Sequence, residues 1–124
     1  MYGPERGASL MLQSKELVAA STTPMVLSIL TRGETYGYAI IQEVRDLSGS
    51  KIEWSDGMLY PVLRRLAKQG LVKSRWRVSE ETGKKRRYYQ INRKGRDVLA
   101  EQQSQWQMTN RVLNKLWKLE PCTT

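Results

Sequence analysis

Apolar side chains recur at helical spacing in the first half of the chain and predict three short helices. In the first, Pro24 interrupts the pattern, so the helix either kinks there or begins near Thr22 and Thr23. Ser55 can cap the third helix, which ends at Gly70. The apolar positions are Leu17, Val18, Met25, Val26, Ile29 and Leu30 in the first helix, and Ile40, Ile41, Val44 and Leu47 in the second, over residues 36–49.

The second half of the chain changes to strand-like spacing and then returns to helical spacing. Residues 71–78 alternate, residues 86–92 are rich in strand formers, and the polar stretch 79–85 lies between them. This pattern predicts a β-hairpin with a basic tip. Asn92 can cap a final helix that runs to about Leu119, roughly 40 Å at 1.5 Å per residue. The predicted fold is therefore mainly α with a small β-hairpin.

The final helix carries an apolar stripe that its own chain has little left to cover. The stripe consists of Leu99, Trp106, Thr109, Val112, Leu113, Leu116 and Trp117. Pairing with the same helix of a second chain would cover it. We therefore expect a flexible N-terminal arm over residues 1–13, a folded domain over 14–92 and a C-terminal dimerisation helix over 93–120.

Basic residues are concentrated in one part of the chain. The net charge of the whole chain is +9, but residues 64–96 alone hold 13 basic and 2 acidic residues, a net charge of +11. Such a concentration indicates an anionic partner, above all double-stranded DNA. A solvated run of charge on an ordinary surface is the alternative explanation.

The residue types that are missing exclude several kinds of site. Histidine is absent and Cys122 is the single cysteine, so one chain cannot assemble a Cys/His zinc site or an internal disulfide. No apolar run is long enough to span a bilayer, and the first residues do not resemble a signal peptide. We expect a cytoplasmic protein with no cofactor, metal or membrane partner. An enzyme is the weakest explanation, because no phosphate-binding loop or recognisable carboxylate pair is present.

Three helices followed by a basic hairpin are the layout of a winged helix-turn-helix domain, whose third helix enters the major groove of DNA. On a helical wheel Gly57, Pro61, Arg64 and Lys68 lie nearly opposite the apolar stripe of Leu59, Val62, Leu63 and Leu66. Pro61 leaves the carbonyl of Gly57 unpaired on that outer side, where water or DNA can reach it. The predicted DNA-binding residues are Tyr38, Ser55, Gly57, Met58, Tyr60, Pro61, Arg64, Arg65, Lys68, Lys84, Lys85, Arg86 and Arg87.

Three stretches of the sequence carry a family resemblance. They are TPMVLSILTRGETYGYAIIQEV, GMLYPVLRRLAKQGLV and RRYYQINRKG, and together they resemble the PadR family of bacterial transcriptional regulators. The resemblance implies a winged-helix dimer, usually a repressor, that is joined through its C-terminal helix. It also implies DNA contacts from the third helix, the Tyr-Gly-Tyr turn and the wing. Asn92 and Arg93 depart from the family pattern but can still begin a helix.

Individual residues have expected roles within this domain. Tyr38 is favoured over Tyr36 for a phosphate contact, because one of the two is expected to pack in the core. Arg64 and Arg65 are the candidates to read the edge of a guanine. The run of Lys84, Lys85, Arg86 and Arg87 is expected to neutralise phosphates rather than read bases.

Two explanations remain open for Trp106. It either packs at the dimer seam or, as a similar multidrug-responsive subgroup of the family implies, sandwiches a small planar apolar or aromatic effector with the second copy. Gln102 and Thr109 leave the seam near Trp106 poorly filled, as a ligand cavity requires.

The expected function is sequence-specific transcriptional regulation. We expect a homodimeric repressor that binds a pseudo-palindromic operator. The alternative is a basic architectural or RNA-binding protein without a specific operator.

Overall fold

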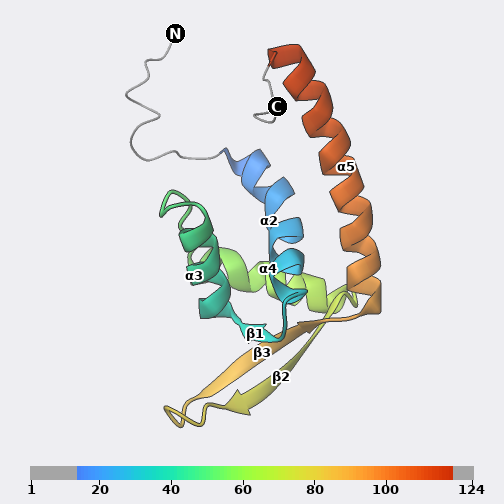
Figure 1. Cartoon of the computed structure of the whole chain (residues 1–124). Helices are drawn as coiled ribbons and strands as arrows, with labels where there is room; N and C mark the ends of the chain where they lie inside the picture. Colours follow the sequence, from blue (N-terminus) through green and yellow to red (C-terminus); the bar gives the residue numbers. More distant parts are fainter. Residues whose placement is uncertain (1–13, 119–124) are drawn as a thin grey trace.

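A computed structural model describes residues 14–118, which form four helices and three strands (Figure 1). In chain order they are α2 (Lys15–Leu30), β1 (Thr35–Tyr36), α3 (Gly37–Leu47), α4 (Asp56–Lys68), β2 (Val72–Val78), β3 (Lys85–Ile91) and α5 (Arg93–Trp117). The predicted arm over residues 1–13 and the end of the predicted C-terminal helix at 119–120 lie outside the described residues. Within 14–118, no helix combines the length and the hydrophobicity that a membrane crossing requires.

The first helix continues through Pro24. It begins at Lys15, where Ser14 Oγ accepts a hydrogen bond from Leu17 N at 3.1 Å. The predicted alternative, a start just before Pro24, is therefore wrong. Pro24 cannot donate to the carbonyl of Ala20, but Ala20 is exposed, so water can satisfy that oxygen.

α4 begins and packs as its sequence predicts. Ser55 Oγ accepts a hydrogen bond from Met58 N at 3.2 Å, which caps the helix. Leu59, Leu63 and Leu66 are fully buried. The opposite side of α4 is consequently left to face solvent.

The predicted hairpin of β2 and β3 belongs to a three-stranded antiparallel sheet with the order β1-β3-β2. β1 was not predicted, because two residues are too few to show an alternating pattern. Its residue Thr35 pairs with Tyr89, and Tyr36 pairs with Tyr88. This pairing ties the start of α3 to the wing, the hairpin of β2 and β3 that projects from the helices in Figure 1.

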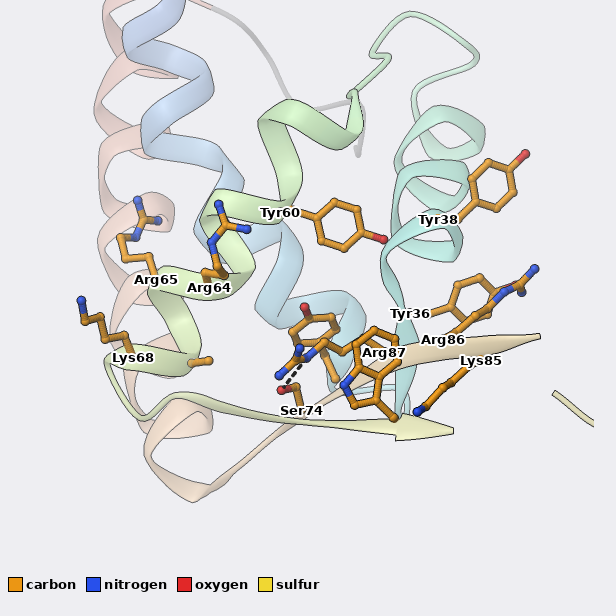
Figure 2. A pocket seen from close by; sticks show the side chains of 13 residues that line it. Tyr36, Tyr38, Tyr60, Arg64, Arg65, Lys68, Ser74, Lys85, Arg86 and Arg87 are labelled. Carbon is orange, nitrogen blue, oxygen red and sulfur yellow. Dashed lines mark hydrogen bonds between the residues drawn. The ribbon is translucent and has the colours of Figure 1, made fainter. Parts of the chain in front are cut away.

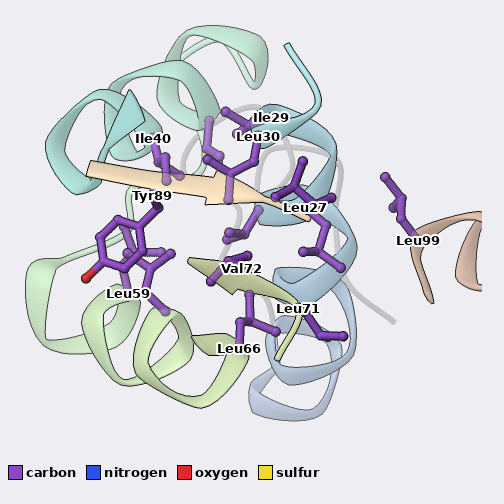
Figure 3. Close-up of a cluster of buried hydrophobic side chains, with 14 of the residues drawn as sticks. Leu27, Ile29, Leu30, Ile40, Leu59, Leu66, Leu71, Val72, Tyr89 and Leu99 are labelled. Carbon is purple, nitrogen blue, oxygen red and sulfur yellow. The ribbon is translucent and has the colours of Figure 1, made fainter. Parts of the chain in front are cut away.

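The core collects apolar side chains from α2, α3, α4, the sheet and the start of α5 (Figure 3). Leu99 of α5 reaches into it and is 4% exposed, while Trp54, which the sequence patterns did not single out, is 8% exposed. Two residues that we expected on apolar faces lie outside it: Leu17 is 43% and Leu47 is 68% exposed. The core is therefore smaller than the hydrophobic patterns predict.

The start of α5 is held against the end of α4. Asn92 Oδ1 accepts a hydrogen bond from Gly95 N at 2.9 Å, and Asn92 Nδ2 donates to Gly70 O at 2.7 Å. A Cβ atom on Gly95 would overlap the carbonyl oxygen of Leu71, so a larger residue would push the helix away. These contacts set the direction of α5, which lies antiparallel beside α2 (Figure 1).

Candidate nucleic-acid interface

The outer face of α4 combines low bulk with positive charge. Gly57, Pro61, Arg64 and Lys68 are all exposed, as the helical wheel predicts. Within the described residues, a Cβ atom on Gly57 would meet only Ser55 Oγ, at 3.9 Å. The first two turns of this face therefore allow another molecule to approach the backbone closely.

A hollow of about 990 Å³ lies between α4 and the wing, and we call it the basic hollow (Figure 2). Six basic side chains line it, and no aspartate or glutamate does. The basic residues are Arg64, Arg65, Lys68, Lys85, Arg86 and Arg87, and the other lining residues are Tyr36, Tyr38, Tyr60, Ala67, Ser74, Trp76 and Tyr89. A concave surface with charge of one sign suits a polyanion such as the DNA backbone.

The two arginines predicted to read guanine differ in their surroundings. Arg65 Nη2 donates a hydrogen bond to Thr23 Oγ1 of α2 at 2.8 Å. Within residues 14–118, Arg64 makes no hydrogen bond or salt bridge through its side chain. Arg64 is thus the more available of the two for a base edge.

The inner face of the wing is the side of β2 and β3 that carries Ser74, Trp76, Lys85 and Arg87. Arg87 Nε donates a hydrogen bond to Ser74 Oγ at 3.1 Å, drawn as a dashed line in Figure 2. The Arg87 guanidinium lies 5.2 Å and the Lys85 ammonium 5.5 Å from the centre of the Trp76 ring. Neither cation has a carboxylate partner among the described residues, so both keep their charge for an incoming anion.

On the outer face of the wing, Arg75 and Arg77 both pair with the carboxylate of Glu34. Arg75 donates to the Glu34 carboxylate from Nε at 2.7 Å and from Nη2 at 2.9 Å, and Arg77 Nη1 donates at 3.2 Å. The hydrogen bonds from Arg75 and the charges of both arginines hold the pKa of Glu34 below its ordinary value, although burial opposes them. These two arginines are structural partners of Glu34 in the free protein.

The basic run at the wing tip divides between the two faces. Lys85 and Arg87 point to the inner face, whereas the Arg86 guanidinium lies 4.5 Å over the ring of Tyr36 on β1. Lys84 is exposed in the turn and does not line the basic hollow. The four residues that the sequence treats as one cluster therefore have three different environments.

Tyr60 reaches from α4 to the start of α3 (Figure 2). A Cβ atom on Gly37 would lie 2.5 Å from Tyr60 Oη and 2.7 Å from its ring carbon Cζ, so only glycine leaves room for this ring. Burial raises the pKa of the Tyr60 phenol, Asp56 raises it further, and Arg86 opposes the shift. The phenol therefore stays protonated at neutral pH and keeps an O–H donor at the wall of the basic hollow.

The other predicted contact residues on α3 and α4 differ in accessibility. Tyr38 is 57% exposed, and its hydroxyl accepts a hydrogen bond from Gln42 Nε2 at 2.9 Å. Tyr36 is half-buried against Tyr88 and Arg86 of the wing and not in the core, so the expectation that one of the two tyrosines packs in the core was wrong. Ser55 is exposed with its Oγ engaged as the cap of α4, and Met58 packs partly against the core.

The predicted dimer residues of α5 do not all share one surface. Leu99 is buried in the core of its own chain, so including it in an intermolecular seam was wrong. Further along the helix Val112 is 50%, Leu116 70% and Trp117 62% exposed. The remaining members are Thr109, which is exposed, and Leu113, which is half-buried. The distal half of α5 thus carries the uncovered apolar surface.

Trp106 is half-buried beside a second hollow, of about 500 Å³, between α5 and the helices α2 and α3. The apolar residues around it are Pro24, Met25, Ile29, Val44, Leu47 and Ile52. Gln102 Oε1 on the same helix is buried and has no hydrogen-bond partner within the described residues. Both open explanations for Trp106, packing and ligand binding, are compatible with this position.

Three residues of the interface escaped the sequence reasoning. Trp76 was recognised as part of a strand, but its alternation with Arg75 and Arg77 is typical of the buried face of a strand, so no local pattern predicted its exposure. The role of Glu34 had no local signal, because its partner Arg75 is distant in the sequence. The steric need for Gly37 also depends on a residue of another helix, Tyr60.

Comparison with known proteins identifies the family. Residues 26–101 match the Transcriptional regulator PadR-like family. The chain is similar to transcriptional regulator YqjI of Escherichia coli, with 36% identity over 87 residues, which cover 70% of this chain and 36% of that protein. The chain thus matches only about a third of the length of YqjI.

Solved structures show the same architecture. A transcriptional regulator from Clostridium thermocellum matches with a TM-score of 0.74 at 30% identity, covering 84% of this chain and 97% of that one. A PadR-like transcriptional regulator from Bacillus cereus matches with a TM-score of 0.73 at 28% identity, covering 86% and 100%. The predicted fold, a winged helix-turn-helix with a long C-terminal helix, is confirmed, and the chain belongs to the PadR-like family of DNA-binding transcriptional regulators.

Proposed function

We propose that this protein binds a pseudo-palindromic operator as a homodimer and represses transcription there. The observation that carries the proposal is the basic hollow, in which six basic and no acidic side chains line the space between α4 and the wing. With the outer face of α4 in the major groove, this hollow would enclose the adjacent sugar–phosphate backbone. The choice of repression rests on the family resemblance.

Selection of bound fragments from the source genome tests the existence of an operator. The protein is mixed with genomic fragments and an excess of random duplex, and the bound DNA is sequenced. A sequence-specific regulator enriches a small set of sites that share half-sites about 34 Å apart, one helical turn. Equal recovery of all fragments would instead support an architectural protein, and preferential recovery of added RNA would support an RNA-binding one.

Arg64 is the proposed reader of a guanine edge. Replacement of Arg64 by alanine should cost about 1–3 kcal/mol at one base pair and relax the preference there. Arg65→Ala is the matched control, because it removes the same charge from a side chain that bonds Thr23. It should weaken binding evenly across operator variants. The assignment is wrong if only Arg65→Ala relaxes the preference.

The distal half of α5 is the proposed dimer surface. Val112, Leu116 and Trp117 are at least half exposed on a helix of 25 residues, longer than any other in residues 14–118. A two-fold pairing would cover these side chains and place two copies of α4 on one side of the DNA.

Two matched substitutions test this surface. Leu116 is 70% exposed, and Gln107 is an exposed residue of the same helix that lies nine positions earlier, about 180° around the helix from Leu116. Sedimentation equilibrium should show a dimer for the wild type and for Gln107→Asp, and a monomer for Leu116→Asp. Equal masses for the three proteins would show that this side of α5 does not form the dimer interface.

The hollow beside Trp106 favours a second function, the binding of a small planar apolar or aromatic effector that relieves repression. Its volume of about 500 Å³ and largely apolar lining suit such a ligand. Planar cationic dyes should quench the tryptophan emission of the wild type and release the operator. If emission responds equally in wild type and in Trp106→Ala, Trp106 only packs.

A further inference from the structure

Trp76 is an exposed indole within a cationic surface, and none of the DNA contacts described above uses it. Its side chain is 54% exposed, whereas Val72 on the same face of β2 is 3% exposed. Trp76 lies four residues farther along the strand, about 13 Å at 3.3 Å per residue. It therefore points to the same side as the core but lies beyond it, where it lines the basic hollow.

Two cations accompany this ring. Arg87 is the direct cross-strand partner of Trp76, and Lys85 lies next to it on the same face of β3. Both charges are within 5.5 Å of the ring centre, and Ser74 holds Arg87 in place through its hydroxyl. The wing thus presents a flat, apolar indole ring with two positively charged side chains beside it.

We propose that Trp76 makes an apolar contact in the minor groove of the operator while Lys85 and Arg87 neutralise the phosphates that border it. Charge complementarity selects DNA as the occupant, because no acidic side chain lines this hollow. Apolar side chains act in this way in proteins that bind the minor groove. The inference rests on the proposed function and adds a source of sequence preference that α4 does not supply.

The preference follows from the chemistry of the groove floor. Only G·C pairs place an amino group there, the guanine 2-amino group. An indole at the floor would meet this group, so the steps contacted by the wing should favour A·T pairs. The alternative role of Trp76 is that of a platform which only holds Lys85 and Arg87 in position.

Salt dependence separates the two roles. The slope of log affinity against log salt reports the number of neutralised phosphates, about 0.9 per phosphate. Loss of an apolar contact lowers affinity without changing the slope. Loss of a platform frees the two cations and makes the slope shallower.

The experiment measures operator affinity by fluorescence anisotropy at several salt concentrations for wild type, Trp76→Ala, Trp76→Phe and Leu17→Ala. Leu17→Ala is the control, because it removes an apolar side chain of comparable exposure, 43%, from the first turn of α2, away from α4, the wing and the distal half of α5. Trp76→Ala should bind at least about tenfold more weakly with an unchanged slope, Trp76→Phe should keep most of the affinity, and Leu17→Ala should match wild type. Thermal unfolding confirms that each variant is folded.

A second duplex locates the contact. Inosine replaces guanine in the flank covered by the wing, which removes the 2-amino group and leaves the major groove unchanged. Wild type should bind the inosine duplex more tightly than the guanine duplex, and Trp76→Ala should bind the two equally. The inference is overturned if Trp76→Ala binds within twofold of wild type, if its slope becomes shallower, or if wild type ignores the exchange. If the wild-type protein enriches no site in the selection from genomic DNA, the proposed function itself is wrong.

Discussion

Two pairs of basic residues, one on each face of the wing, differ in what they contact. On the outer face Arg75 and Arg77 donate hydrogen bonds to the Glu34 carboxylate. On the inner face Lys85 and Arg87 lie beside the ring of Trp76 and have no acidic partner within residues 14–118. One pair fastens the wing to the loop after α2, and the other keeps its charge uncompensated.

This difference shows that the number of charges on a hairpin does not locate its binding face. An arginine paired with a carboxylate must lose that partner before it can neutralise a phosphate, whereas an arginine on an indole or a hydroxyl loses little. We therefore assign phosphate neutralisation to Lys85 and Arg87 and a structural role to Arg75 and Arg77. Three sets of variants, in order of expected effect, can break or sharpen this account of the interface.

Removing two charges from either face gives the largest expected difference. The double variant Lys85→Ala/Arg87→Ala should weaken DNA binding by about tenfold or more and make the salt slope shallower by roughly 1.8, the value for two phosphates. Arg75→Ala/Arg77→Ala removes the same number of positive charges and should change the slope by much less, because the Glu34 carboxylate already binds both guanidinium groups. Anisotropy titrations over a range of salt concentrations measure both. Equal slopes for the two variants would erase the distinction between the faces.

A methyl group at Gly37 should have an intermediate effect. Because its Cβ would lie 2.5 Å from Tyr60 Oη, Gly37→Ala should displace the Tyr60 ring from the wall of the basic hollow. We expect a stability loss of about 1–3 kcal/mol, as for other overpacked sites, and weaker DNA binding. Chemical denaturation and anisotropy measure the two effects.

Gly57→Ala is the control for Gly37→Ala. Its Cβ has open space, so stability should stay equal or rise by up to about 1 kcal/mol, the helical preference of alanine. DNA affinity should nevertheless fall, because the methyl group stands on the proposed groove-facing side of α4. A normal affinity for Gly57→Ala would indicate that this side does not approach DNA closely.

Loss of the outer-face carboxylate should have the smallest effect. The pKa of Glu34 is held below its ordinary value of 4.5, so its ion pairs stabilise the folded protein above that pH and stop doing so as the pH falls through the lowered value. Glu34→Gln should therefore unfold at a slightly lower temperature than wild type at pH 7. The difference should vanish in strongly acidic buffer. An equal difference at both pH values would exclude ionised Glu34 as its cause.

Local patterns predicted most of the elements, and contacts between distant residues explain what the sequence left undecided. The caps at Ser55 and Asn92, the stripe of α4 and the alternation of the wing all depend on neighbours in the chain. β1 and the pairing of Glu34 with Arg75 depend on residues that only folding brings together, so no local pattern in the sequence predicted them. Leu99 was wrongly assigned to the dimer surface for the same reason. The heptad spacing of α5 does not show which of its apolar residues pack in the core of their own chain.

The residues proposed to contact DNA were predicted as a set, but not in their separate environments. Lys84 to Arg87 form one run in the sequence, yet the alternation of β3 sends Arg86 onto Tyr36 and its two neighbours to the inner face. Arg64 and Arg65 are adjacent, yet only Arg65 meets Thr23. Identifying which charges remain unpaired requires the positions of the other elements.

Site-directed DNA cleavage tests the central claim, that the outer face of α4 lies in the major groove, most directly. An iron–EDTA reagent is attached to a cysteine at position 61, Pro61→Cys, in a Cys122→Ser background, and the control carries Gln107→Cys on the side of α5 opposite Leu116. The account predicts two clusters of strong cuts on the operator, about 10 base pairs apart, from the reagent at position 61 and weak cuts from position 107. Cuts from position 61 no stronger than those from position 107 would contradict it.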